Sequence, residues 1–175
     1  MSANKHELER FTNAWSLESR KTLTLLESLP PTQYDYRPDM TGRSLGELAW
    51  HLAEVEAYVT HGIEVGRYDL ATRPPGVERP REVASLAPGY RRVHDEAFAR
   101  VRNLRGDDLG RRLRFFNGQD MRIGELLWGA LLHHLIHHRG QLTLMCRLAG
   151  GKVPGLYGPT REEMAALRAN LQAKS

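Results

Sequence analysis

The sequence is poor in cysteine and in long apolar runs. Its single cysteine, Cys146, excludes an intramolecular disulfide and any zinc site built from several cysteines. We expect this thiol to be a buried, unreactive core residue. No apolar run approaches the roughly 18 residues that a membrane-spanning helix needs. The first residues are charged and lack the apolar core of a signal peptide, so we expect a cytoplasmic protein with no membrane partner.

The charge of the chain is close to balanced, with a formal excess of +4. Most of the cations are arginines spread along the sequence, and the densest group is Arg111, Arg112 and Arg114. Nucleic-acid binding would need a clustered basic face or a recognisable motif, and neither is present, so we expect no nucleic-acid partner. A chain of 175 residues with 41% hydrophobic and 26% charged residues suits a single globular domain over residues 1–175.

Helical signals dominate and predict an all-α fold. Ser44 with Glu47, and Thr160 with Glu163, form capping boxes that mark two helix starts. The proline-rich segment 67–84 is long enough to be a crossover between distant corners of a bundle. Long helices are expected over residues 5–28, 44–66, 84–104 and 123–149, with a short C-terminal helix over 160–172. This pattern predicts a four-helix bundle with one long crossover.

A hairpin signal interrupts the helical pattern. Asn117 and Gly118 lie between two short runs of alternating apolar and polar residues, over 113–121. We expect a short hairpin there, directly before the fourth long helix.

The most informative feature is a cluster of histidines. Four of the eight histidines lie within six residues, at His133, His134, His137 and His138. Residues four apart on a helix lie one turn above each other, so an H-x-x-x-H pair can hold one metal ion. Spacing alone leaves two pairs open, His133 with His137 and His134 with His138.

Helical phase favours one of these pairs. At about 100° per residue, His134 and His138 lie within roughly 30° of the direction opposite the polar side, whereas His133 and His137 lie about 110° and 70° away. The inward pair is therefore His134 and His138. The residues taken to mark the polar side are Arg122, Glu125, Arg139, Thr143 and Arg147.

A catalytic zinc-type site usually needs a third protein ligand, here from another helix. His51 borders the apolar stripe of the second helix, and His61 points further round. His6 is near the chain start, and His94 lies beside Asp95 and Glu96 in a charged stretch. The residues alone leave His51 as either a third ligand or a hydrogen-bonded core histidine. A di-iron bundle is disfavoured because the chain contains no Glu-x-x-His sequence.

Two sequence blocks resemble the DinB-like family. One is H-L-I-H-H-R-G-Q-L from His134, followed by R-L-A-G and V-P-G-L-Y-G; the other runs from Leu29-Pro30 to G-R-S-L-G-E-L-A-W-H-L, which contains His51. The resemblance covers nearly the whole chain in the right order. It implies an up-down-down-up four-helix bundle and, carried over residue by residue, a metal site formed by His51, His134 and His138. The family often has threonine three residues before the glutamate that opens the fourth helix, where this chain has Arg122 before Glu125.

The resemblance also implies a function. The family includes enzymes that attach bacillithiol to electrophiles, a mycothiol-dependent maleylpyruvate isomerase and similar thiol S-transferases, so the resemblance implies a metal-dependent thiol S-transferase. Its cofactor would be one divalent transition metal (zinc, nickel or iron), its partners a small electrophile and a low-molecular-weight thiol, and its assembly a homodimer. A metal-dependent hydrolase, a non-catalytic metal-binding stress-response bundle and a pocket that has lost its metal remain alternatives.

No catalytic acid or base can be assigned from the sequence. Glu54 reads as a surface carboxylate and Tyr58 as a core residue with a hydrogen-bonded hydroxyl. Tyr157 is either a structural loop residue or a residue that closes over the site. Arg139 points away from the metal and suits a packing or salt-bridge role.

Overall fold

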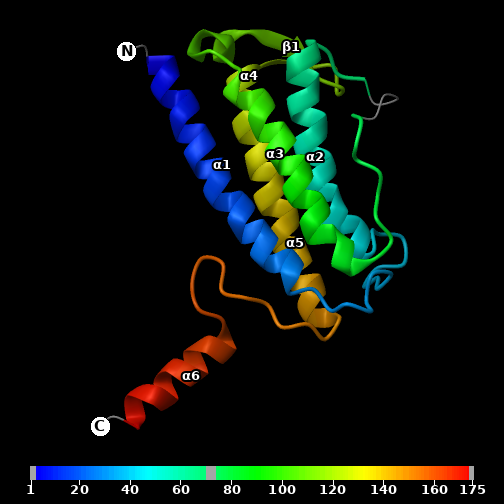
Figure 1. Ribbon diagram of the computed structural model, residues 1–175, viewed down its shortest axis with the longest axis vertical. Coiled ribbons are helices and arrows are strands. Elements are labelled where there is room, and N and C mark those ends of the chain that lie inside the picture. The colour runs from blue at the N-terminus through cyan, green and yellow to red at the C-terminus, as the bar shows by residue number, and fades with distance from the viewer. Residues whose placement is uncertain (1–2, 70–73, 174–175) are drawn as a thin grey trace.

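The computed structural model describes residues 3–69 and 74–173, which form a bundle of long helices with a small hairpin at one end (Figure 1). Two 3-10 turns, η1 (Val83–Ser85) and η2 (Gly106–Gly110), precede α3 and the hairpin. The helices are α1 (Ala3–Glu27), α2 (Leu45–Val65), α3 (Leu86–Arg102), α4 (Ile123–Glu125), the π-helical segment η3 (Leu126–His133), α5 (His134–Leu148) and α6 (Arg161–Gln172). None of the helices in the described ranges combines the length and apolar character needed to cross a bilayer.

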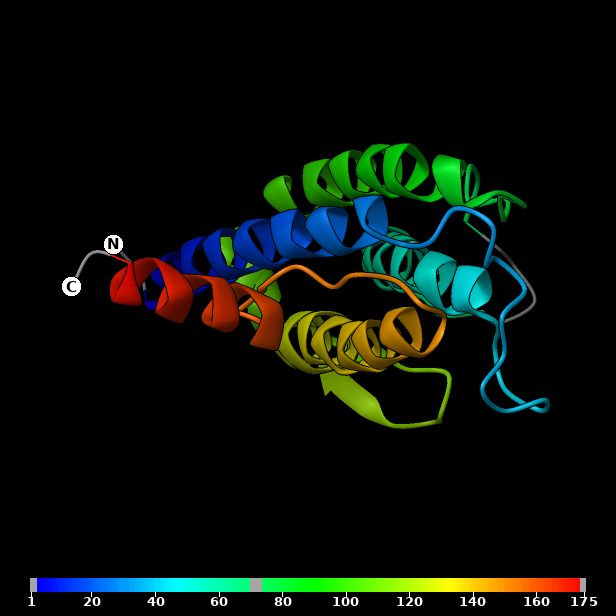
Figure 2. The ribbon, with the colours of Figure 1, turned by 90° about the horizontal axis from the view of Figure 1, so that it is seen from below.

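The four long helices have the up-down-down-up topology. Helix α1 runs in one direction, α2 and α3 run in the other, and the continuous helix α4–η3–α5 returns (Figure 1). Because α2 and α3 are parallel, the chain between them must travel back along the bundle, as the proline-rich segment predicted. Helix α2 packs against α3 and α5, and α1 packs against the same two helices, which closes the ring seen end-on in Figure 2. The predicted all-α bundle is confirmed.

The predicted helix boundaries are close to those observed because the caps are local. The Ser44 side chain accepts a hydrogen bond from the backbone of Glu47, whose carboxylate accepts one from the Ser44 N–H. Helix α2 ends at Gly66, whose φ of 76° is a left-handed conformation that glycine adopts without strain. Arg122 cannot accept a cap hydrogen bond, but the Glu125 carboxylate still accepts one from the Arg122 N–H at 2.8 Å. The hydrogen bond from the Arg122 N–H to the Glu125 carboxylate is thus enough for the fourth helix to start at Ile123, although the side-chain cap is missing.

The hairpin forms at the segment 113–121, for which the sequence predicted it. Strand β1 (Arg112–Arg114) pairs antiparallel with β2 (Asp120–Arg122). The Gly118 N–H donates to the Phe115 carbonyl, and Gly118 has a φ of 83°, as expected for the glycine that closes such a loop. The fold is therefore an all-α bundle with one small two-stranded sheet.

The fourth long helix departs from the regular α-helix that the phase argument assumed. Residues Leu126–His133 are π-helical, so each residue turns through a smaller angle than in an α-helix. Arg139, which the helical phase predicts on the solvent side, is only 1% exposed, so this prediction is wrong. The buried stripe of α5 contains Leu135, Arg139, Leu142 and Cys146. His134 and His138 are half-buried beside this stripe rather than at its centre.

A buried ion pair joins α5 to α1. Arg139 forms a salt bridge with Glu18 and also donates to the Glu18 carbonyl at 2.7 Å and to the Thr22 hydroxyl at 3.2 Å. The Tyr157 hydroxyl bonds to both Glu18 and Arg139, and the Lys21 ammonium lies 3.8 Å from the centre of the Tyr157 ring. The predicted salt-bridge role of Arg139 is borne out. Tyr157 has a structural role on the α1 side and does not close over the histidines.

A second buried polar cluster fills the middle of the bundle. Glu56 of α2 is fully buried and accepts hydrogen bonds from Trp15 (3.0 Å) and Tyr90 (2.5 Å). The His94 Nδ1 atom lies 2.7 Å from the same carboxylate. His94 is only 8% exposed, although Asp95 and Glu96 follow it directly in the sequence. Its partner is contributed by another helix, which sequence neighbours cannot reveal.

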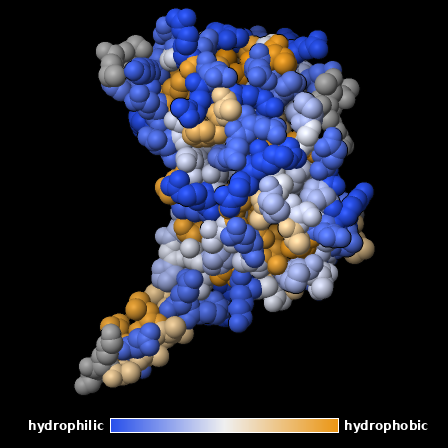
Figure 3. Space-filling model, viewed as in Figure 1, coloured by the Kyte–Doolittle hydropathy of each residue, from blue (hydrophilic) through white to orange (hydrophobic). Residues whose placement is uncertain are grey.

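Helix α6 contributes nothing to the core. Thr160 caps it as predicted, but none of its residues is buried. It projects away from the bundle with Leu167 and Leu171 at least half exposed, and apolar surface is visible on this arm in Figure 3.

Candidate metal centre

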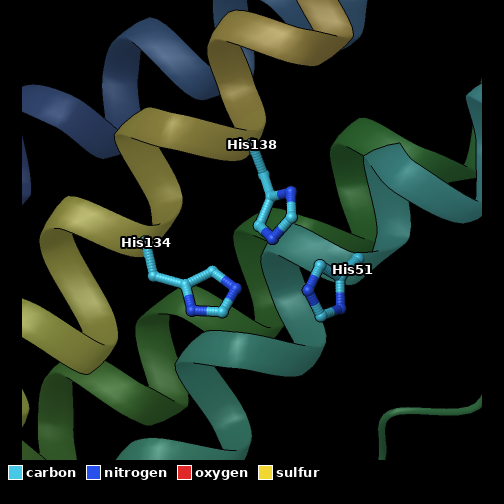
Figure 4. A group of neighbouring side chains, drawn as sticks. All are labelled: His51, His134 and His138. Atoms are coloured by element: carbon cyan, nitrogen blue, oxygen red, sulfur yellow. The ribbon is translucent and has the colours of Figure 1, made fainter.

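The structure brings together the three histidines of the predicted site. His51 of α2 faces His134 and His138 of α5, and the three rings converge on one point (Figure 4). One ligand nitrogen from each residue lies within 4.8 Å of the others. Nitrogens that share a tetrahedral zinc ion lie about 3.4 Å apart, given bonds of about 2.05 Å. Small rotations of the side chains would close this difference, so the group can hold one metal ion.

Hydrogen bonds indicate which nitrogens are available. The His138 Nδ1 atom lies 2.7 Å from the Gln141 side-chain oxygen, and the His51 Nδ1 atom lies 3.5 Å from a Glu54 carboxylate oxygen. These contacts leave the Nε2 atoms of both rings free. The His134 Nε2 atom is buried and has no hydrogen-bond partner in the described part of the chain. A buried ring nitrogen without a partner is costly unless something else binds it, which fits a metal ligand.

The electrostatics favour the neutral form of the two α5 rings, His134 and His138. Burial lowers the pKa of His134 to about 4, and the neighbouring His138, His51, His137 and Arg43 act in the same direction. Burial also lowers the pKa of His138, although its bond to Gln141 works against this. Only a neutral imidazole has a lone pair for a metal, so this pair is prepared for coordination at neutral pH.

The metal-free fold should lose stability as the pH falls from about 6.5 towards 4. The ordinary imidazole pKa is 6.5 and that of folded His134 is about 4. Between these values the unfolded chain binds the additional proton, so the contribution of neutral His134 is complete above pH 6.5 and decreases below it. Denaturant unfolding of the metal-free protein at pH 7 and pH 5 measures this change. His134→Asn should show a smaller change, and an equal change in both proteins would contradict this effect.

The remaining histidines are placed elsewhere. His133 and His137 are exposed, as expected for flank residues, and His6 is exposed on α1. His61 lies 3.5 Å from Glu64 on α2. None of them joins a metal-binding group within residues 3–69 and 74–173.

Glu54 belongs to the site, and the prediction that it is a surface carboxylate is wrong. It is half-buried between the His51 ring and Arg79, which donates to it at 2.9 Å. Burial alone would raise the pKa of Glu54, but the His51 ring and the Arg79 guanidinium together lower it, so the carboxylate is ionised. A carboxylate behind a ligand histidine fixes the ring orientation and increases its basicity. Because Arg79 lies 25 residues away in the chain, its approach could not be seen in the sequence.

The histidines open into a cavity of about 500 Å³ between α2, α5 and the hairpin. Tyr58 lines it, and the Tyr58 hydroxyl is buried with no hydrogen-bond partner among the described residues, contrary to the expected hydrogen-bonded core hydroxyl. Burial, with a smaller effect from Asp69, raises the pKa of Tyr58, so the hydroxyl stays protonated and can donate to a ligand. The residues that line the cavity are Arg43, His51, Glu54, Val55, Tyr58, Val59, Pro74, Val77, Arg79, Phe115, Phe116, Ala130 and His134.

Comparison with known proteins agrees with this architecture. The model of the DinB family matches residues 1–174. The chain is 34% identical over 164 residues to the uncharacterized protein YrdA of Bacillus subtilis strain 168, over 90% of this chain and 92% of that protein. A DinB-like protein from Bacillus cereus ATCC 10987 has a similar crystal structure, with a TM-score of 0.72, 27% identity and coverage of 85% of this chain and 97% of that one. The DinB-like protein YjoA of Bacillus subtilis has the same fold, with a TM-score of 0.69, 22% identity and coverage of 84% and 96%.

Proposed function

The chain belongs to the DinB family, and from this premise we propose that it is a metal-dependent enzyme that transfers a low-molecular-weight thiol to a small electrophile. The observation that supports this best is the open side of the histidine triad. Within the described ranges no fourth histidine, cysteine or carboxylate joins the three rings, and His51 and His134 face the cavity. Three protein ligands with an open position are typical of catalytic sites, whereas structural sites are closed by four.

The donor set suits zinc, nickel or iron, since all three accept imidazole nitrogen. When bound, such an ion would lower the pKa of a thiol and stabilise its thiolate form. The protein contributes the orientation of the rings through Glu54 and Gln141 and an apolar wall that limits access of water. The protonated Tyr58 hydroxyl can donate a hydrogen bond to the ligand in the cavity.

The sulfur must come from a co-substrate because the chain's cysteine is unsuitable as a nucleophile. Cys146 is fully buried, and burial raises its pKa, so the thiolate is disfavoured. In the transfer, a sulfur–carbon bond forms as the bond between that carbon and the leaving group breaks. The leaving group keeps the bonding electron pair, and the thiol proton passes to solvent.

A metal-dependent hydrolase would use the same open position to activate water. The two functions differ in what the reaction consumes, because a hydrolase acts without any thiol. A non-catalytic bundle would show neither reaction and would use the ion only to stabilise the fold.

The proposed transfer is tested by a panel of low-molecular-weight thiols with chlorodinitrobenzene, whose conversion to a thioether is followed by absorbance. Protein reloaded with zinc, nickel or iron should accelerate the reaction of at least one thiol, and metal-free protein should lose nearly all of this rate. His51→Ala should behave like the metal-free protein, whereas His133→Ala should keep the activity. Turnover of ester substrates without thiol would favour the hydrolase, and inactivity on both panels would favour the non-catalytic bundle.

A further inference from the structure

Arg43 lines the cavity and directly precedes Ser44, the N-cap residue of α2. The loop that carries it is fixed, since Leu45 and Gly46 donate backbone hydrogen bonds of 2.9 Å to the carbonyls of Tyr36 and Tyr34. The Arg43 side chain lines the same cavity as His51 and His134. Its charge is close enough to affect both His134 and His138. A loop with an anchored backbone therefore carries the Arg43 guanidinium into the cavity on the open side of the triad.

Arg43 differs from its neighbouring arginines in having no partner among the residues that the structure describes. Arg37 forms a salt bridge with Glu47 at 2.8 Å, and Arg79 bonds to Glu54 and also approaches Glu47. Arg43 forms no hydrogen bond or ion pair with any residue in the part of the chain that the structure describes. Among the charged residues that line the cavity, Glu54 forms a salt bridge with Arg79, whereas Arg43 has no ion-pair partner within residues 3–69 and 74–173.

The rest of the cavity wall is largely apolar. Valine and phenylalanine side chains cover the part away from Arg43, including Val55, Val59 and Phe116. A ligand that fits this cavity is therefore anionic near the triad and apolar further away. A guanidinium presents a planar fork that matches a carboxylate with two parallel hydrogen bonds.

We propose that Arg43 selects thiols that carry a carboxylate, pairing with the carboxylate while the sulfur occupies the open side of the triad. This inference rests on the proposed function and specifies its co-substrate. The thiol is assigned the carboxylate, rather than the electrophile, because Arg43 lines the cavity together with the ligand histidines His51 and His134. The electrophile then occupies the apolar part of the cavity beside Tyr58 and Phe116.

The test measures thiol binding without turnover. Cobalt-loaded protein is titrated with mercaptopropionate and with mercaptopropionamide, a neutral thiol of similar size, and the cobalt–thiolate absorption band reports sulfur binding. The wild-type protein should bind the acid roughly tenfold or more tightly than the amide, the ratio expected for a charge-assisted hydrogen bond. Arg43→Gln should abolish this preference and leave the affinity for the amide unchanged. Arg43→Lys should restore only part of it.

The matched control is Arg81→Gln, which removes an arginine that is also exposed but does not line the cavity. It should keep the preference of the wild-type protein. A second arm uses metal-free protein, with calorimetric titration of phenylpropionate and its amide, so that Arg43 is tested even without metal.

The outcomes separate the two proposals. Failure of the wild-type protein to bind cobalt would contradict the proposed function. Equal affinities for acid and amide, or a preference that survives in Arg43→Gln, would overturn the role of Arg43. A preference seen with phenylpropionate but absent with the thiols would overturn the assignment of the carboxylate to the thiol.

Discussion

Replacement of His134 by alanine should reduce the metal content from about one ion per chain to nearly zero. The variant loses one of three ligands, and the one removed carries the buried Nε2 atom that has no protein partner. His51→Ala and His138→Ala should have the same effect because no other ligand group lies close enough among the described residues to replace them. Elemental analysis of protein purified without a histidine tag measures the content directly.

The matched control is His133→Ala, which removes an exposed histidine from the adjacent position of the same helix. It should keep its metal. Gln141→Ala and Glu54→Ala remove the partners of ligand rings rather than ligands, and each should weaken metal affinity about 10- to 100-fold without abolishing binding. Metal retained by His134→Ala together with metal lost from His133→Ala would place the ion on the alternative pair and refute the assignment.

Replacement of Glu18 by alanine should destabilise the fold by about 3–5 kcal/mol. Glu18 is 8% exposed and Arg139 is 1% exposed, so the variant leaves a guanidinium charge in the core without its carboxylate. The Tyr157 hydroxyl would lose its acceptor at the same time. Burial alone would raise the pKa of Glu18, but hydrogen bonds from Lys21, Tyr157 and Arg139 outweigh this and lower it. The contribution of the ionised carboxylate is therefore complete at neutral pH and is lost as the pH falls through the lowered pKa.

Denaturant unfolding at neutral pH provides the measurement. Glu9→Ala is the matched control, because Glu9 lies on the same helix and is exposed, and it should change stability by no more than about 0.5 kcal/mol. The double variant Glu18→Leu with Arg139→Met removes both charges and should recover most of the loss. If Glu18→Ala were as stable as Glu9→Ala, the pair would not carry the energetic role that its burial indicates.

Local signals explain how much of the fold could be predicted. Ser44 and Glu47 lie one helical turn apart, so a capping box is visible in the sequence and survives unchanged in the structure. The same holds for Thr160 with Glu163 and for the glycine turn of the hairpin. Each of these depends on residues within a few positions of each other, whose interaction needs no knowledge of the rest of the chain.

The sequence predicted correctly which histidine pair is the more buried, although two assumptions about the helix were wrong. Spacing identified two possible histidine pairs, and helical phase ranked His134 and His138 as more inward than His133 and His137. That order agrees with the observed exposure, although the marker Arg139 is buried and the segment before His134 is π-helical. The prediction of His51 as the third ligand depended on the family resemblance, because nothing around His51 in the sequence distinguishes a ligand from a core histidine.

Contacts between distant segments were decided by the tertiary structure alone. Glu54 is oriented by Arg79, His94 is paired with Glu56, and Arg139 is neutralised by Glu18, all across intervals that no local pattern spans. The sequence by itself determined the helices, their caps and the set of candidate ligands, because these follow from interactions within a turn or from residue chemistry. Only the packed bundle decided which charges are buried with partners, and among the described residues it leaves the guanidinium of Arg43 unpaired, in the cavity next to the three histidines.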